Sequence, residues 1–216
     1  NGHPALDALK DAGYEVVFST PGVQPDEEEL ISLLPGCVGY LAGVEKITAR
    51  VLEAAADLKV IARNGTGIDN VDQEAAQRLG IKVCRAEGAN ARGVAELALT
   101  LMLSLARSIP FSDAAIKQAD WKRRQGVEME GRTLGIVGCG KIGKLVAGFG
   151  LAMGMRVLAY DIYQDESFKP SNDFEYASLD EVIKNSDFIS LHCPPQKGVY
   201  LIDENAIASM KKNVYI

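Results

Sequence analysis

Three glycines have the types and spacing of a site that binds a diphosphate. Gly138, Gly140 and Gly143 form a Gly-x-Gly-x-x-Gly pattern directly after an apolar, β-branched run. The first glycine permits a tight turn, the second lets the backbone approach a pyrophosphate, and the third lets a helix pack closely on a strand. The phosphates would then lie on the N–H groups that open the following helix. The pattern alone is a weak signal, because glycine-rich turns without a ligand are common.

Asp161 strengthens this interpretation. It ends a second apolar run, Arg156–Tyr160, and follows Gly143 by 18 residues. A carboxylate at that place accepts hydrogen bonds from the adenosine ribose hydroxyls of a dinucleotide, although an ordinary turn residue is the alternative. The carboxylate would repel the 2′-phosphate of NADP, and no arginine follows in residues 162–164 to accommodate it. The sequence therefore predicts NAD as the cofactor.

Other chemistries are less well supported. Residues 135–141 fit the start of an ATPase phosphate loop, but Ile142 stands where a Ser or Thr hydroxyl would ligate magnesium. The two histidines, His3 and His192, do not form a metal motif. The four cysteines show no C-x-x-C pair, so we expect no metal and no disulfide; reduced cysteines fit a cytoplasmic protein. These are Cys37, Cys84, Cys139 and Cys193.

Strand-like and helix-like segments alternate along most of the chain, which predicts an α/β fold with parallel sheets. The expected strands are Glu15–Ser19, Gly36–Leu41, Lys59–Arg63, Lys82–Arg85, Thr133–Val137, Arg156–Tyr160, Asp187–Leu191 and Asn213–Ile216. The expected helices are Pro4–Ala12, Pro25–Leu34, Thr48–Ala56, Gln73–Leu79, Lys141–Met153 and Ser178–Asn185.

A helical stretch without strands, from Asn90 to Ala119, separates two groups of these elements. Its part from Val94 to Ala106 is apolar nearly all round, so we expect it to be covered on most sides, and Pro110 interrupts it. It is about half as long as a membrane span. An interdomain helix and a subunit interface both fit. The formal net charge of −6 argues against nucleic acid as a partner.

At this point the sequence resembles the D-isomer-specific 2-hydroxyacid dehydrogenases, most of all their phosphoglycerate dehydrogenase branch. Besides the glycine motif and Asp161, residues 63–72 resemble the family's substrate loop, 90–96 its hinge, and 190–194 the loop along the cofactor. The resemblance implies a flavodoxin-like substrate domain at 1–88 and a Rossmann-type NAD-binding domain at 89–216. We expect both to be truncated, the first lacking its first strand and the second its C-terminal part.

The resemblance also implies site residues. Backbone N–H groups of Gly65, Thr66 and Gly67 would bind the substrate carboxylate, with Asn64 nearby and Thr66 also close to the nicotinamide. A turn that caps the helix at Asp72 is the alternative. The pyrophosphate would contact the backbone of Lys141 and Ile142, and the adenosine side would be lined by His192, Cys193 and Pro194. The position of His192 implies cofactor packing and not catalysis.

The implied reaction is hydride transfer between nicotinamide and C2 of a D-2-hydroxy acid. The family's catalytic arginine, glutamate and histidine are expected beyond Ile216, so we expect the 216-residue polypeptide alone to be inactive. Measurable hydroxyacid oxidation by that polypeptide would contradict this. For the substrate, 3-phosphoglycerate stays open: Arg63 matches that branch, but Ala42 stands where the branch tends to have an arginine.

Two related functions stay open as well. One is an NAD-sensing, corepressor-like binding protein, which the absence of the Arg, Glu and His trio would favour. The other is a formate-oxidising dehydrogenase. The resemblance further implies a homodimer formed through the nucleotide domain, for which the helix around Val94–Ala106 offers apolar surface.

Overall fold

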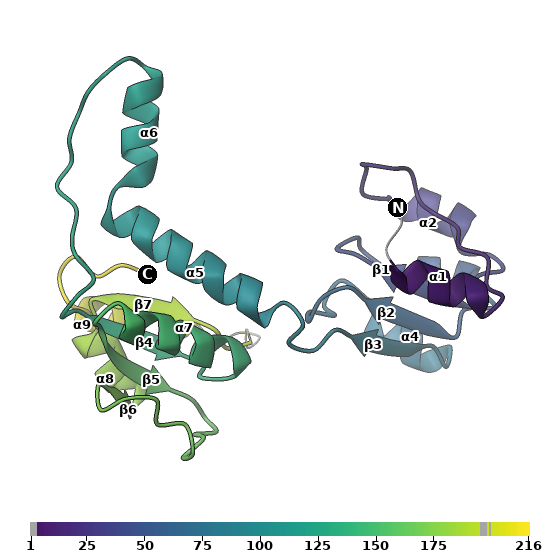
Figure 1. Ribbon diagram of the computed structural model, residues 1–216. Helices are drawn as coiled ribbons and strands as arrows, with labels where there is room; N and C mark the ends of the chain where they lie inside the picture. The colour runs from purple at the N-terminus through teal and green to yellow at the C-terminus, as the bar shows by residue number, and fades with distance from the viewer. Residues whose placement is uncertain (1–3, 195–197, 199) are drawn as a thin grey trace. The chain divides into compact units, whose positions relative to one another are not determined.

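The chain divides into two compact units, which a computed structural model describes over residues 4–194, 198 and 200–216. The first unit ends at Asn90 and the second begins at Ala91, two residues after the boundary expected from the sequence (Figure 1). His3 lies outside the described residues.

The first unit contains a three-stranded parallel sheet in the order β1-β2-β3. The strands are β1 (Gly39–Ala42), β2 (Val60–Arg63) and β3 (Lys82–Arg85), and the helices are α1 (Pro4–Asp11), α2 (Glu27–Leu33), α3 (Ala49–Ala54) and α4 (Gln73–Arg78). The last three helices begin where Asp26, Thr48 and Asp72 accept a hydrogen bond from the first turn. Buried aliphatic side chains, among them Ile61 and Leu52, form the core between these helices and the sheet.

The predicted strand Glu15–Ser19 is wrong. Residues 14–20 form neither a strand nor a helix, and Val17 and Phe18 are 57% and 56% exposed. A β-branched run becomes a strand only when a neighbouring strand supplies hydrogen-bonding partners, and no described strand lies beside this one. Likewise α1 buries none of its residues.

The second unit contains a four-stranded parallel sheet in the order β6-β5-β4-β7. Its strands are β4 (Thr133–Val137), β5 (Arg156–Tyr160), β6 (Phe174–Tyr176) and β7 (Phe188–Leu191), and its helices include α7 (Lys141–Ala152), α8 (Leu179–Asn185) and α9 (Glu204–Ser209). The chain runs outward from β4 to β5 and β6 and then crosses to β7 on the other side of β4. The carboxyl ends of β4 and β7 therefore form a topological switch point, where open α/β sheets bind ligands.

Three short elements differ from the sequence prediction. Strand β6 and helix α9 were not predicted, and the expected strand Asn213–Ile216 contributes only a bridge from Tyr215 to Phe188. The two rings of that bridge stack with their centroids 4.7 Å apart, so ring packing and the backbone hydrogen bonds of Tyr215 place this segment beside β7.

The long helical stretch forms two helices, α5 (Ala91–Ala106) and α6 (Ile109–Lys117), with a bend of 66° between them. The break lies at Ser108, whose φ is 52°, and not at Pro110, which lies in the first turn of α6 where a missing N–H costs little. Among the described residues no single helix has the length and apolar composition of a membrane span, although α5 and α6 meet that test as a pair.

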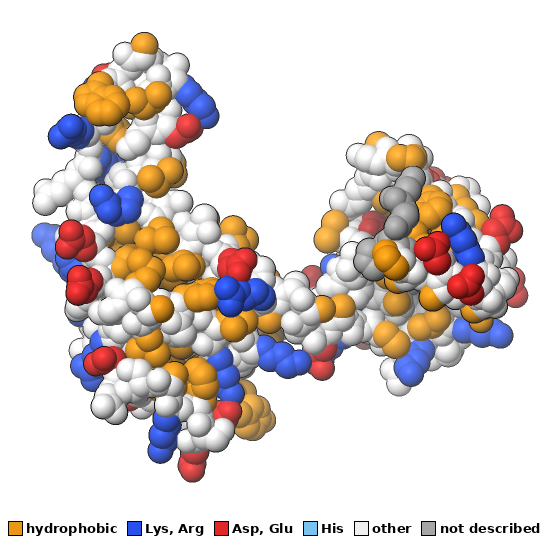
Figure 2. Space-filling model, viewed as in Figure 1, with side chains coloured by type: hydrophobic (Ala, Val, Ile, Leu, Met, Phe, Trp, Pro, Cys, Tyr) orange, Lys and Arg blue, Asp and Glu red, His pale blue; other side chains and the backbone are white. Residues whose placement is uncertain are grey.

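One face of α5 packs on α7, and the opposite face is open. Ala95, Met102 and Ala106 are buried, whereas Leu97, Leu101 and Leu105 are 57%, 55% and 46% exposed. The prediction that this helix is covered on most sides is therefore wrong for this chain by itself. Figure 2 shows hydrophobic side chains gathered along α5 and α6.

Candidate dinucleotide site

The glycine loop between β4 and α7 lies at the switch point of the sheet. Gly138 has a φ of 96° and donates its N–H to the carbonyl of Tyr160, 2.8 Å away. A Cβ on Gly138 would lie 2.6 Å from the backbone nitrogen of Cys193. Glycine is therefore required here both by the left-handed turn, as predicted, and by the loop that follows β7, which crosses directly over it.

The other two glycines differ in what surrounds them. A Cβ on Gly143 would lie 2.1 Å from the carbonyl oxygen of Gly138 and 3.2 Å from a methyl group of Ile136, which confirms the predicted close packing of helix on strand. A Cβ on Gly140 would meet no described atom within 4 Å. Gly140 is also the residue before α7 and provides no side-chain cap. The start of α7 is thus open to a ligand at Gly140, where an anion would meet the positive end of the helix.

Asp161 ties the end of β5 to this loop. One carboxylate oxygen accepts the N–H of Cys139 at 2.7 Å, and the other accepts the N–H of Tyr163 at 2.9 Å. The bond from Tyr163 shows that Asp161 does act as a turn residue. Each carboxylate oxygen can accept a further hydrogen bond, and Asp161 is only half-buried, so the same side chain keeps capacity for a ligand hydroxyl.

The loop after β7 presents His192, Cys193 and Pro194. The N–H of His192 donates to the carbonyl of Val137 at 2.7 Å, and its ring nitrogen Nε2 lies 2.9 Å from the hydroxyl of Ser190. Burial lowers the pKa of His192, so the imidazole is neutral at pH 7. Cys193 is half-buried against Gly138, and Pro194 is exposed.

Two further side chains beside the glycine loop are neutral at pH 7. Burial raises the pKa of the Cys139 thiol, and burial raises the pKa of Tyr176 to about 12. Neither group is activated as a nucleophile or a base, because both need a lowered pKa for that role. Among the described residues no three His, Cys, Asp or Glu side chains lie close enough to hold a metal ion.

The predicted substrate loop follows β2 in the first unit. Arg63 lies beneath it and donates through Nε to the side-chain oxygen of Asn70 at 2.9 Å and through Nη1 to the carbonyl of Asn64 at 3.1 Å. Thr66 donates its hydroxyl to the side-chain oxygen of Asn90 at 3.1 Å. Asp72 caps α4, so the turn-and-cap role weighed from the sequence is present in this loop. The predicted carboxylate contacts of Gly65 and Gly67 stay a prediction.

Sequence reasoning gave no role to Glu45, a buried carboxylate beside this loop. It accepts hydrogen bonds from the hydroxyl of Tyr40 and from the N–H of Gly43, the latter at 2.7 Å. Burial and the carboxylate together raise the pKa of Tyr40, so this tyrosine stays a donor. Asn70 donates to the carbonyl of Glu45 at 2.7 Å and so joins the loop after β1 to the substrate loop. The spacing Gly43-x-Glu45 was the feature of the sequence that could have indicated the hydrogen bond between these two residues.

The sequence also gave no role to the pair of Lys144 and Asp165. Lys144 lies in the first turn of α7, and its ammonium group forms an ion pair with Asp165 in the segment after β5. The two residues are 21 positions apart, and no spacing rule in the sequence links them.

Comparison with known proteins places these features in a family. Residues 99–216, more than half of the chain, match the model of the D-isomer specific 2-hydroxyacid dehydrogenase NAD binding domain. The chain belongs to this family. The glycine loop, Asp161 and His192 all lie within the residues that match the NAD-binding domain of this family.

Relatives of the chain extend the likeness to the first unit. The chain is 42% identical over 195 residues to a hydroxypyruvate reductase of Thermotoga maritima, covering 88% of this chain and 63% of that protein. It is 43% identical over 216 residues to a D-3-phosphoglycerate dehydrogenase of Methanocaldococcus jannaschii, covering 98% and 41%. The chain thus spans less than two thirds of either relative.

A solved structure agrees. A D-lactate dehydrogenase from Aquifex aeolicus, complexed with NAD and lactic acid, superposes with a TM-score of 0.73 at 31% identity, covering 95% of this chain and 61% of that one. The predicted fold class and family are therefore confirmed.

Proposed function

We propose that the complete protein is an NAD-dependent oxidoreductase that transfers a hydride between nicotinamide and C2 of a D-2-hydroxy acid. The observation that carries the proposal is the pairing of an open helix start at Gly140 with the carboxylate of Asp161, which accepts a hydrogen bond from the N–H of Cys139, the residue before Gly140. The diphosphate binds at the start of α7, against the backbone of Lys141 and Ile142, and Asp161 accepts the ribose hydroxyls. NAD supplies the hydride acceptor when it is bound.

The remaining cofactor contacts come from the loop after β7. His192, Cys193 and Pro194 line the adenosine and ribose side. Because His192 is neutral and hydrogen-bonded to Ser190, its imidazole packs on the cofactor without adding a positive charge.

The first unit is the substrate domain in this proposal, and the second is the NAD-binding domain. The amides of Gly65, Thr66 and Gly67 bind the carboxylate of the substrate, with Asn64 nearby and Thr66 also close to the nicotinamide. Arg63 and Asn70 hold this loop from below. Fixed amides suit a carboxylate because they need no reorganisation when the anion arrives. The proposal assigns no proton-transfer group within residues 1–216.

A direct spectrophotometric assay tests the proposal. The complete protein is mixed with NADH and a panel of 2-oxo acids, including hydroxypyruvate, and loss of NADH absorbance is followed. We expect turnover of at least one acid and a lower kcat/KM for NADH in Asp161→Asn. The enzyme names of the relatives favour this outcome over an NAD-sensing, corepressor-like protein. Tight NAD binding without turnover of any acid would contradict the enzyme and favour sensing.

The proposal also includes a homodimer and a cytoplasmic location. Leu97, Leu101 and Leu105 recur every four residues and form one open apolar stripe on α5, which a second copy of the same stripe covers through a two-fold axis. Four unpaired cysteines fit a reducing compartment.

Light scattering tests the dimer. We expect Leu101→Lys to halve the mass that the complete protein has in solution, from dimer to monomer. Leu79→Lys, at an exposed leucine of the first unit, should leave that mass unchanged. A monomeric unmodified protein would remove this part of the proposal.

A further inference from the structure

The segment after β5, residues 161–168, joins the two halves of the proposed cofactor site. Asp161 begins the segment, and Asp165 and Phe168 lie further along it. We propose that Lys144 and Asp165 are positioning residues for NAD: their ion pair fixes the Asp161 carboxylate relative to the first turn of α7. This inference rests on the proposed function, because it assigns the spacing between the diphosphate and ribose subsites.

The charged contact links the segment directly to α7. Lys144 lies four residues after Gly140, and its side chain reaches Asp165, with 30% and 41% of the two side chains exposed. Asp165 also accepts the N–H of Ser167 at 3.0 Å and its hydroxyl at 2.5 Å. The hydrogen bond from Lys144, followed by those from Ser167, lowers the pKa of Asp165 to about 2, so the Asp165 carboxylate is charged at pH 7.

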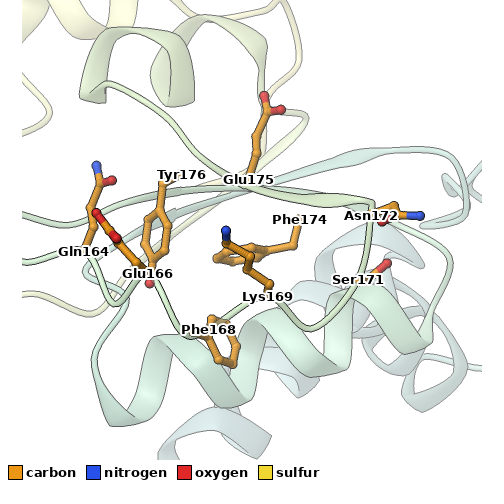
Figure 3. Close-up of a pocket in the computed structure, with 9 residues that line it drawn as sticks. All are labelled: Gln164, Glu166, Phe168, Lys169, Ser171, Asn172, Phe174, Glu175 and Tyr176. Atoms are coloured by element: carbon orange, nitrogen blue, oxygen red, sulfur yellow. The ribbon is translucent and has the colours of Figure 1, made fainter.

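An aromatic row anchors the other side of the segment. The Lys144 ammonium lies 5.2 Å from the centroid of the Phe168 ring. Phe168 meets Phe174 edge-on at 5.1 Å, and Phe174 meets Tyr176 edge-on at 5.2 Å, both on strand β6. Figure 3 shows these three rings among the side chains that line a hollow of about 800 Å³ beside β6. The segment is therefore held between α7 and the sheet edge.

The part of the segment next to Asp161 is short and exposed. Only Ile162, Tyr163 and Gln164 separate Asp161 from Asp165, and Ile162 and Tyr163 are 68% and 83% exposed. A three-residue connection spans at most about 10 Å, which limits how far Asp165 can lie from Asp161. Asp161 is held by the N–H groups of Cys139 and Tyr163, and the Lys144–Asp165 pair holds the segment that follows it.

The ion pair also determines where the ammonium group of Lys144 is directed. A cation in the first turn of a helix is unfavourable to the helix dipole, and a neighbouring carboxylate offsets this. With its ammonium group on Asp165 and over Phe168, Lys144 is directed at the segment and acts on the diphosphate only through the position of α7.

Isothermal titration calorimetry on the complete protein tests the inference, with NAD and ADP-ribose as probes. ADP-ribose lacks the nicotinamide and so reports on the adenosine half alone. We expect Lys144→Gln and Asp165→Asn each to lower the affinity for both ligands about three- to fivefold, as for a partly exposed ion pair. Lys144→Arg should bind both ligands as tightly as the unmodified protein does. Lys184→Gln, which breaks an exposed pair with Asp180 on α8, is the matched control and leaves both affinities unchanged.

A double-mutant cycle separates positioning from general stability. In an Asp161→Asn background, Lys144→Gln should change the affinity for ADP-ribose less than twofold, because the group it positions is gone. An equal loss in both backgrounds, or an unchanged affinity in Lys144→Gln and Asp165→Asn, would overturn the inference. If Lys144→Gln does not fold, Asp165→Asn and Lys144→Arg decide the matter.

Failure of the proposed function gives a different pattern. In that case the unmodified protein binds no NAD, or Asp161→Asn binds it equally well. In another outcome the unmodified protein binds NAD, Asp161→Asn lowers the affinity, and both ion-pair variants leave it unchanged. That result would contradict only the positioning role of Lys144 and Asp165.

Discussion

The two glycine-rich loops of this chain both follow a parallel strand, yet their glycines are needed for different reasons. In the loop after β4, added Cβ atoms on Gly138 and Gly143 would strike backbone atoms at 2.6 and 2.1 Å. In the loop after β2, added Cβ atoms on Gly65 and Gly67 would meet only side-chain atoms, of Arg63 at 3.0 Å and of Asp69 at 2.8 Å. Backbone cannot move aside at low cost, whereas the end of a side chain can rotate.

The difference teaches where packing ends and ligand binding begins. Gly138 and Gly143 are required by the fold itself. Gly140 and Gly67 are not, so a requirement for glycine at those two positions would have to come from a bound molecule. Substitutions that separate stability from binding therefore test this comparison.

The largest effect is expected for Gly143→Ala. The new Cβ would strike the carbonyl of Gly138, and we expect a loss of roughly 3 kcal/mol in the free energy of unfolding, measured by urea denaturation. Gly148→Ala on the same helix is the matched control: its Cβ meets no described atom within 4 Å, and we expect a gain of about 0.5–1 kcal/mol. Similar values for both variants would break the comparison.

Gly140→Ala should separate binding from folding. The urea midpoint should stay unchanged because the added Cβ points into open space, while NAD affinity falls about tenfold or more as the Cβ enters the path of the diphosphate. Thermal melts with and without NAD measure both quantities. Unchanged NAD stabilisation in this variant would place the diphosphate elsewhere.

Gly67→Ala tests the loop after β2. Asp69 can turn away from the new Cβ, so the free energy of unfolding should change by less than about 1 kcal/mol. We expect the KM for the 2-oxo acid to rise while the KM for NADH holds, measured by steady-state kinetics. A rise confined to the KM for NADH would contradict the substrate role of this loop.

The smallest effect concerns pH. Burial lowers the pKa of His192 in the folded protein, so the unfolded chain takes up the proton first, and the contribution to stability is lost as pH falls below about 6.5. Urea midpoints between pH 7 and 5 should fall less in His192→Gln than in the unmodified protein. An identical fall in both would show that other groups govern this range.

Periodicity predicted most of the sheet because the central strands bury both faces. Thr133–Val137 and Arg156–Tyr160 have the bounds that the apolar runs indicated. Strand β6 is only three residues long, and its burial depends on Phe174 meeting Phe168 and Tyr176. Such a strand carries too short a pattern to be distinguished from a loop.

The errors at the edges have a different cause. Glu15–Ser19 has the composition of a strand, but a strand needs a partner, and composition does not reveal whether one is present. The break between α5 and α6 lies at Ser108, two residues before the proline that suggested it, because proline is tolerated in the first turn of a helix.

The candidate site was predictable where a motif fixes it and not where tertiary contacts do. Gly138, Gly143 and Asp161 lie where the motif requires. The sequence did not show that Asp161 binds the N–H of Cys139, that the loop after β7 crosses Gly138, or that Lys144 pairs with Asp165. Each of these contacts joins residues more than 20 positions apart, beyond the reach of local spacing rules.

The central claim is that the start of α7 and Asp161 together bind NAD. Calorimetric titration of the complete, unmodified protein with NAD and with NADP tests it most directly. We predict that NAD binds and that NADP binds at least about tenfold more weakly, because its 2′-phosphate meets the Asp161 carboxylate. Absence of NAD binding, or equal affinity for the two cofactors, would contradict the account.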